Sequence, residues 1–335
     1  MIKKFFPLLF LFLFCLPSIL SAETLKDGFY NEYDQDGNLL RTVEYRYNQP
    51  NGRFRTFYKD GLVKGWGEYS SGQLDGMAQG FYKSGVLKIK SFYRQGKLHG
   101  MATIYYGSGR PKAEITYING VQEGLTREYD VYGRLQFERV FVDGKEQGVT
   151  KEYYPSGNVW REYDYVNGRQ KGSIREYFQN GVLKSAGAAA DGALNGKGSE
   201  FYVTGELKLE GFYKDGKLDG LAELFYSNGK LRSRVNFKNG VMNDEAWREF
   251  YDTGELWRVV KIENGKEQGD AKEYYKSGVL KSEGAFQNGK REGVFKSFSE
   301  DGALQFEDDY KNDHQLRRKE LNQDGKLIME QFYYE

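Results

Sequence analysis

The stretch YKDGKLDG (residues 213–220) places two glycines four residues apart behind a tyrosine, and the chain repeats this arrangement many times. Close copies are YRQGKLHG (93–100), YINGVQEG (117–124), FVDGKEQG (141–148), YVNGRQKG (165–172) and FQNGKREG (286–293). A fixed spacing of 24 residues indicates a repeat architecture. Twelve repeats start at residues 28, 52, 76, 100, 124, 148, 172, 196, 220, 245, 269 and 293, and a partial one begins near residue 316.

Four repeat positions, counted from the start of each repeat, hold nearly constant residue types. Position 10 is glycine and position 6 is Tyr or Phe in all twelve repeats, position 12 is aliphatic in eleven, and position 18 is aromatic in ten. These are structural positions. Representative residues are Gly85, Gly157 and Gly229 at position 10, Tyr153 and Tyr177 at position 6, Leu207 at position 12, and Tyr213 at position 18.

Two short runs rich in Tyr, Phe, Val, Leu and Thr separate the glycine turns of each repeat, and runs of six or seven residues favour strands over helices. The turns carry Asn-Gly or Asp-Gly, as at 119–120 and 215–216, and both dipeptides tolerate the positive φ of a tight hairpin. The sequence therefore predicts an all-β fold: an elongated, single-layer antiparallel array of about twelve β-hairpins. The charges at positions 13 and 15 predict a solvated ladder of opposite signs.

The beginning of the chain is typical of a secretory signal peptide. A basic start, an apolar run to Leu20 and the small pair Ser21-Ala22 predict cleavage after residue 22, leaving the repeat array in residues 23–335. We therefore expect an exported protein, periplasmic or secreted, with membrane attachment only through an uncleaved signal. The predicted mature chain has no cysteine and a net charge near zero, which excludes disulfides and thiolate metal sites and argues against nucleic acid as a partner.

No constellation of catalytic residues stands out from the repeat. The only histidines are His99 and His314, both beside turns, so histidine-based triads and metal clusters are excluded. The segment DQDGN (34–38) lacks the spacing of a calcium loop. We expect no catalytic residue, no metal and no cofactor, and predict that the protein is not an enzyme.

Departures from the repeat supply the candidate binding residues. Trp66, Trp160 and Trp257 replace charged residues at positions 15, 13 and 13, where they either pack on a position-7 tyrosine or form exposed anchors for a partner. Trp247, at position 3, is expected in the core. In repeat 7, SAGAAADGALNGKG (185–198) replaces the usual aromatic with Ala189, which predicts either a weakened repeat or a flexible joint.

The segment FYKDGKLDGLAELFYSNGKL (212–231) resembles the MORN repeat, in the variant of bacterial YwqK-like proteins that are often labelled antitoxin components. The resemblance implies stacked β-hairpins and a scaffold, with lipid binding proposed for some members. Our leading hypothesis is an exported, non-enzymatic scaffold that binds an unknown protein partner, with a YwqK-like antitoxin or immunity role as a variant of it. The alternative is a module that binds cell-envelope glycan, choline or lipid.

Overall fold

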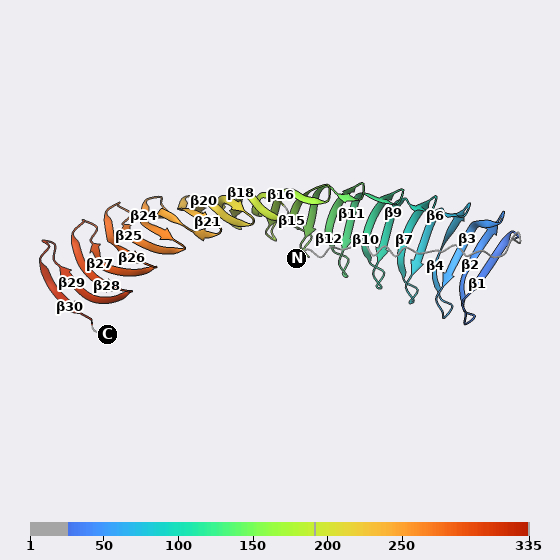
Figure 1. The fold of residues 1–335 in the computed structure, drawn as a ribbon, viewed down its shortest axis with the longest axis horizontal. Coiled ribbons are helices and arrows are strands. Elements are labelled where there is room, and N and C mark those ends of the chain that lie inside the picture. The colour runs from blue at the N-terminus through green and yellow to red at the C-terminus, as the bar shows by residue number, and fades with distance from the viewer. Residues whose placement is uncertain (1–25, 191, 334–335) are drawn as a thin grey trace. The chain divides into compact units, whose positions relative to one another are not determined.

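The computed structural model of the protein describes residues 26–190 and 192–333, and the regular elements of these residues are all strands (Figure 1). The described residues form two compact units, which divide between Val121 and Gln122. Among the described residues no helix is long and apolar enough to cross a membrane. The signal peptide expected at residues 1–22 lies outside the described part of the chain.

The first unit is one antiparallel meander in which each strand pairs with its neighbours in the chain. Two short strands, β5 and β8, continue the pairing beside the hairpin turns. Its strands are β1 (Gly28–Tyr33), β2 (Leu39–Arg46), β3 (Gln49–Phe57), β4 (Val63–Ser70), β5 (Gln73–Leu74), β6 (Gly76–Phe81), β7 (Leu87–Arg94), β8 (Lys97–Leu98), β9 (Gly100–Tyr105) and β10 (Pro111–Ile118).

The second unit has the same antiparallel design, and most of its strands have eight or nine residues. Its strands are β11 (Val121–Tyr129), β12 (Leu135–Val142), β13 (Lys145–Glu146), β14 (Gly148–Tyr153), β15 (Val159–Val166), β16 (Arg169–Tyr177), β17 (Leu183–Ala190), β18 (Ala193–Phe201), β19 (Leu207–Lys214), β20 (Lys217–Phe225), β21 (Leu231–Lys238), β22 (Val241–Met242), β23 (Asp244–Phe250), β24 (Leu256–Glu263), β25 (Lys266–Tyr274), β26 (Leu280–Gln287), β27 (Lys290–Phe298), β28 (Leu304–Lys311), β29 (His314–Leu321) and β30 (Leu327–Phe332). The predicted antiparallel hairpin array is confirmed.

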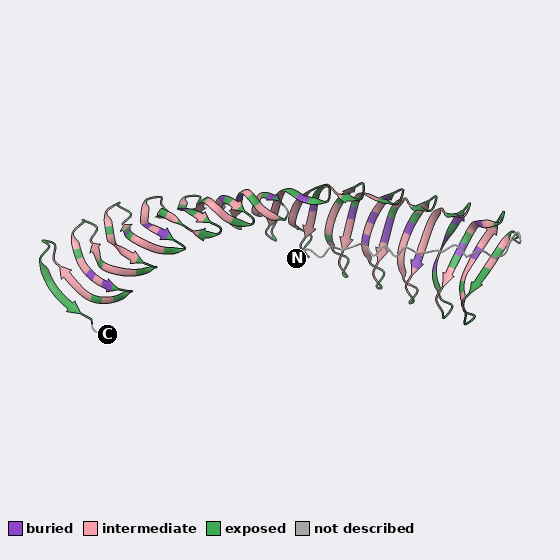
Figure 2. Cartoon of the chain, viewed as in Figure 1, coloured by how far each residue is buried: buried purple, intermediate pink, exposed green. Residues whose placement is uncertain are grey.

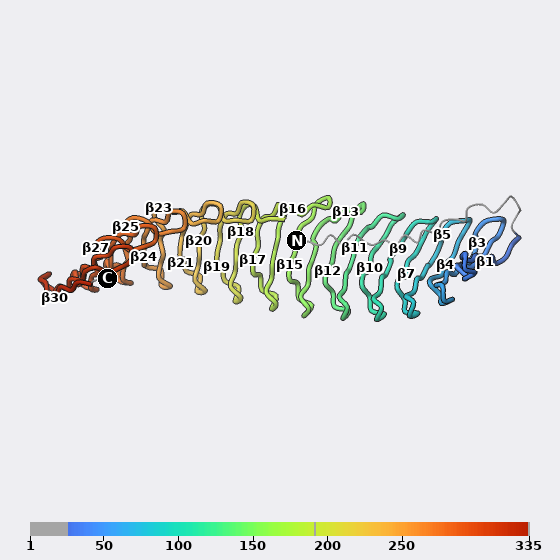
Figure 3. Tube along the Cα trace, turned by 60° about the horizontal axis from the view of Figure 1, so that its bottom comes forward, coloured from blue at the N-terminus to red at the C-terminus, as the bar shows by residue number. Residues whose placement is uncertain are grey.

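Two kinds of turn alternate and lie at opposite edges of each unit (Figure 3). At positions 20–21 both residues have positive φ, as at Asn119 (51°) and Gly120 (86°), which is the two-residue turn that the dipeptides predict. At positions 8–10 a three-residue loop ends in a glycine with positive φ, as at Gly85 (83°), Gly157 (91°) and Gly229 (80°). The constant glycine of position 10 follows from this left-handed conformation.

A β-bulge follows every three-residue loop, and the sequence analysis did not predict it. In repeat 8, Phe201 lies opposite Leu207 while Glu200 lies opposite Leu209, so that Lys208, at position 13, has no residue opposite it. A bulge changes the direction of the side chain that it carries. The side chain at position 13 of each repeat therefore does not follow the regular alternation between the two faces of the sheet.

The core is a narrow row of side chains from positions 3, 14, 16 and 18. The first unit holds the clusters Val43–Phe54–Tyr69 and Ala102–Ala113–Ile115–Tyr117, and the second holds Val260–Ile262–Ala271. Trp247 packs against this last cluster, as expected. Tyr213, at position 18, covers Gly198, where an added Cβ would come within 2.9 Å of the ring. Buried residues are sparse because a single-layer sheet leaves both faces partly open to solvent (Figure 2).

Candidate interaction surface

Tyrosines at position 7 join each repeat to the next at the three-residue turns. The hydroxyl of Tyr202 donates a hydrogen bond of 2.7 Å to the main-chain oxygen of Phe225, the position-6 residue of the following repeat. The same bond recurs from Tyr58, Tyr82, Tyr154, Tyr226, Tyr251 and Tyr275, at 2.7–2.9 Å. We call this row the tyrosine ladder. Sequence reasoning missed it, although a preference for Tyr over Phe at position 7 was a usable signal.

Several repeats lack the ladder hydroxyl. Phe178 has none, and Asp130 instead accepts hydrogen bonds from the main-chain nitrogens of Tyr132 and Arg134, both at 2.9 Å, within its own turn. Although desolvation opposes it, hydrogen bonding from Arg134 and Tyr132 lowers the pKa of the Asp130 carboxyl. The second unit is therefore without this link after repeats 5 and 7.

The opposite edge is joined by main-chain bonds between successive two-residue turns. The nitrogen of Gly216 donates to the oxygen of Leu194 (2.9 Å), and Gly240 donates in the same way to Leu218 (2.7 Å). A carboxylate at position 24 adds a second link, because Asp219 Oδ2 accepts from the nitrogen of Asn239 at 3.1 Å. His99 occupies this position in repeat 3, and its Nδ1 is buried without a hydrogen-bond partner.

Across the face opposite the core row, a charge ladder is formed by positions 4 and 15 and not, as the sequence had predicted, by positions 13 and 15. Position 13 lies at the bulge, where its side chain has no residue opposite it. In the second unit a cation faces a carboxylate: Arg127–Glu138 (2.9 Å), Arg234–Glu223 (2.5 Å), Lys151–Glu162 (3.7 Å) and Lys272–Glu283 (3.7 Å). Tyrosines of position 6 join the row, since the hydroxyls of Tyr153 and Tyr177 donate to Glu138 (2.6 Å) and Glu162 (2.8 Å). Burial and the bond to Glu138 raise the pKa of Tyr153.

Two of the three candidate tryptophans pack on ladder tyrosines. Trp160 lies 5.8 Å from Tyr154 and Trp257 lies 6.3 Å from Tyr251, measured between ring centroids. In other repeats a cation from the same bulge position lies over the tyrosine, as Lys64, Lys88, Lys112, Arg232 and Lys281 do at 5.6–6.0 Å. Both tryptophans are half-buried, and partner binding by either one stays a prediction.

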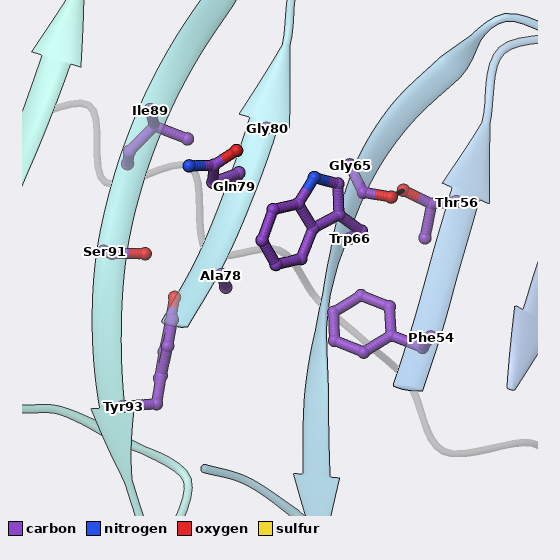
Figure 4. A pocket seen from close by; sticks show the side chains of 10 residues that line it. All are labelled: Phe54, Thr56, Gly65, Trp66, Ala78, Gln79, Gly80, Ile89, Ser91 and Tyr93. Atoms are coloured by element: carbon purple, nitrogen blue, oxygen red, sulfur yellow. Dashed lines mark hydrogen bonds between the residues drawn. The ribbon is translucent and has the colours of Figure 1, made fainter. Parts of the chain in front are cut away.

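Trp66 has a different setting, because it lines an open hollow. Arg53, Arg55, Glu68 and Met77 surround it on the charged face, and the hollow has a volume of about 450 Å³. On the core face at the same place, Gly65, Ala78, Gly80 and Ser91 leave a notch of about 10 Å³ between larger side chains (Figure 4), which is the size of one water molecule. Both faces of the sheet are therefore incompletely covered by side chains near Trp66.

The polar side chains of the described residues serve mainly these repeated contacts. No group of three or more His, Cys, Asp or Glu side chains among them is arranged to hold a metal ion. The buried carboxyl of Glu249 is an outlier, since burial raises its pKa while the nearby Arg232 and Arg258 oppose the shift. Glu249 is the position-5 residue of repeat 10, and it lies opposite Arg258 on one neighbouring strand and Ser233 on the other.

Six segments of the chain match the MORN repeat variant: residues 74–95, 98–119, 146–167, 218–239, 267–288 and 291–312. These matches support a MORN-repeat protein. A comparison with curated proteins finds no match.

Solved structures of much larger chains match most of this chain at low identity and with low TM-scores. "Crystal Structure of TcdB2-TccC3-Cdc42" is 11% identical over 90% of this chain, with a TM-score of 0.15. "Crystal Structure of TcdB2-TccC3 without hypervariable C-terminal region" is 13% identical over 91% of it, with a TM-score of 0.15. This chain spans about a fifth of each of those chains, 22% in both cases.

Proposed function

We propose that the protein is an exported, non-enzymatic scaffold that binds a protein partner through the faces of its sheet, in the manner expected of a YwqK-like MORN-repeat protein. The observation that carries the proposal is the exposure of large apolar side chains in cross-strand pairs on the charged face. Leu125 (37% exposed) lies directly opposite Val140 (36% exposed), and Val149 (39% exposed) has the same repeat position as Leu125 in the next repeat.

Contiguous exposed apolar surface on a soluble protein marks sites of interaction. A second patch in the same unit supports the proposal: Phe212 is 53% exposed and Leu221 is 41% exposed. The two lie on neighbouring strands beside the same residue pair, because Gly211 lies opposite Ala222 and each of these is the chain neighbour of one of them. A sheet that supplies many such positions along its length suits a scaffold.

Affinity purification from the envelope of the producing cells tests partner binding. The wild-type protein should retain a defined protein partner, and the pair Leu125→Glu and Val140→Glu should reduce its recovery. Val131→Glu is the matched control, because Val131 is 54% exposed in a turn outside the patch and should leave recovery unchanged. Recovery of glycan or lipid without any protein would overturn the proposal in favour of an envelope-binding module.

Export is tested separately by N-terminal sequencing of the mature protein. We expect the first residue to be Glu23, because the apolar run and Ser21-Ala22 form a signal-peptide cleavage site. Recovery of soluble cytoplasmic protein that begins at Met1 would show that the export proposal is wrong.

A further inference from the structure

Charge is unevenly distributed between the two units of the chain. Residues 76–113 contain seven Lys or Arg residues and no Asp or Glu. Residues 26–121 contain 14 basic and 9 acidic residues, whereas residues 122–335 contain 33 basic and 38 acidic residues. The first unit is thus cationic in a protein whose total charge is close to zero, and such a field attracts anionic partners.

Around Trp66, the cations of the charge ladder have no carboxylates opposite them. At positions 4 and 15, where several repeats of the second unit pair a cation with a carboxylate, repeat 2 pairs Arg55 with Trp66. The next strands continue the row with Gln79 opposite Trp66 and Lys90 opposite Gln79. No carboxylate therefore occupies the positions that would neutralise Arg55 and Lys90.

One carboxylate lines the hollow, and it compensates the charge only weakly. Glu68 lies 3.8 Å from Arg53, and the two side chains are 55% and 79% exposed. An ion pair between exposed groups at this distance contributes little and is screened by salt. Arg53 also lies near Glu44, whose carboxylate accepts a hydrogen bond of 3.0 Å from the main-chain nitrogen of Arg53, so Arg55 is the less compensated of the two arginines.

The hollow combines an indole, a thioether and two guanidinium groups. Trp, Arg and Met are the residues that are enriched at the centres of protein interfaces, and Trp and Arg contribute most to hot spots. The planar guanidinium group forms paired hydrogen bonds with a carboxylate. Nearby apolar side chains extend the surface, with Phe92 40% exposed and Met101 52% exposed.

We propose that this face of the first unit, centred on Trp66, binds an acidic segment of a protein partner. Carboxylates of the segment contact Arg53, Arg55 and Lys90, and an apolar side chain packs on Trp66 and Met77. A bare polyanion would use the cations alone, whereas a peptide that carries both kinds of side chain uses the whole lining. The inference rests on the proposed scaffold function and names the chemistry of the partner.

The test measures binding of a fluorescent twelve-residue peptide, in which Glu residues flank a central Leu-Phe pair, to the purified protein. The same peptide with Gln for Glu should bind at least tenfold more weakly, and oligoglutamate without Leu-Phe should also bind more weakly. Arg55→Gln should weaken binding of the acidic peptide roughly tenfold, the size of a lost hot-spot contact. Lys296→Gln is the matched control, because Lys296 has the same repeat position in the second unit and should leave binding unchanged.

Trp66→Glu separates binding from folding. Glu is the residue that six other repeats carry at position 15, and it would face Arg55 as Glu138 faces Arg127. The variant should therefore keep or raise the melting temperature while losing peptide binding. The inference is overturned if Trp66→Glu binds like the wild type, or if Lys296→Gln weakens binding as much as Arg55→Gln does.

Two further probes distinguish the kinds of anionic partner. Vesicles containing phosphatidylglycerol or a sulfated polysaccharide that bound more tightly than the peptide, and in a Trp66-dependent way, would overturn the assignment to a protein segment. If the envelope partner is retained equally by the wild type, Arg55→Gln and Trp66→Glu, the proposed scaffold function stands, but the proposal that this surface binds the partner is wrong. If the peptide binds as described but the envelope yields no protein partner, the surface stands and the scaffold function is wrong.

Discussion

A single hydroxyl group distinguishes Tyr202 from Phe178 at position 7 of neighbouring repeats. The Tyr202 hydroxyl satisfies the main-chain oxygen of Phe225, whereas the equivalent oxygen in the next repeat after Phe178 belongs to Phe201 and receives no such bond from Phe178. We expect Tyr202→Phe to lower the free energy of unfolding by about 0.5–1.5 kcal/mol, the usual net value of a hydrogen bond. Phe178→Tyr should raise it by a similar amount, measured by urea unfolding.

Tyr132→Phe provides the control for this pair, since Tyr132, at position 9 of its repeat, is 68% exposed in the loop and lies outside the ladder. It should leave stability unchanged. A destabilisation by Tyr132→Phe as large as that by Tyr202→Phe, or no effect of either change at position 7, would count against the ladder as a source of stability.

Glu249 predicts a pH dependence. Burial raises the pKa of its carboxyl above the ordinary value of 4.5. The folded protein therefore holds this proton more tightly than the unfolded chain does, so that the contribution of Glu249 to stability is present below pH 4.5 and is lost as the pH rises through the raised value. Glu249→Gln cannot ionise, and its melting temperature should rise relative to the wild type between about pH 4 and pH 7.

Glu255→Gln should show the opposite trend, because a hydrogen bond from Thr253 lowers the pKa of the exposed Glu255 carboxyl. In that case the wild-type stabilisation is present above the ordinary pKa and is lost as the pH falls through the lowered one. A melting temperature of Glu249→Gln that fell relative to the wild type with rising pH would contradict the assignment.

At the scale of elements, repeat 7 combines two departures. It lacks the ladder hydroxyl, and Ala189 takes the place of the position-18 aromatic in β17. The strand nevertheless pairs on both sides, and Ala189 is buried. A Cβ added at Gly187 would come within 2.9 Å of Leu194, which shows that a neighbouring leucine covers this part of the row. The segment is thus a regular strand with small side chains.

Since each repeat contacts only its neighbours, a poor interface lowers stability locally. We expect amide hydrogen exchange to be fastest, among the strands of the second unit away from its ends, in β17 and the start of β18. Ala189→Tyr should raise the unfolding midpoint by restoring the aromatic of the other repeats. Uniform exchange protection across the second unit would show that repeat 7 is not a weak element.

At the scale of the whole molecule, the pairing of strands with their chain neighbours predicts limited cooperativity. In each unit stability is a sum of repeat and nearest-neighbour contributions, so unfolding need not be two-state. Urea transitions followed by tryptophan fluorescence, which reports on repeats 2, 6 and 10, should not coincide with those followed by circular dichroism. A single sharp and coincident transition would contradict this expectation.

Much of the fold was predictable because twelve copies of the same pattern identify the strands and turns more clearly than one copy does. Glycine at position 10 of every repeat and Asn-Gly or Asp-Gly at many of the second turns determine the hairpins, and these constraints act through φ at single residues. The tryptophans were harder to interpret from sequence. The two at position 13 share a setting on ladder tyrosines, whereas Trp66, at position 15, does not.

The sequence by itself determined the 24-residue hairpin, its turns and the alternation of strand faces, because backbone sterics and a period of two are local properties. The tertiary structure alone decided which residues of different repeats meet. The tyrosine ladder links residues 23 or 24 positions apart. The bulge at position 13 brings a cation or a tryptophan over most ladder rings, and the hollow at Trp66 depends on Arg55 and Met77 from the two neighbouring strands. Such contacts depend on strand register, which is set by pairing between strands and not by any one of them.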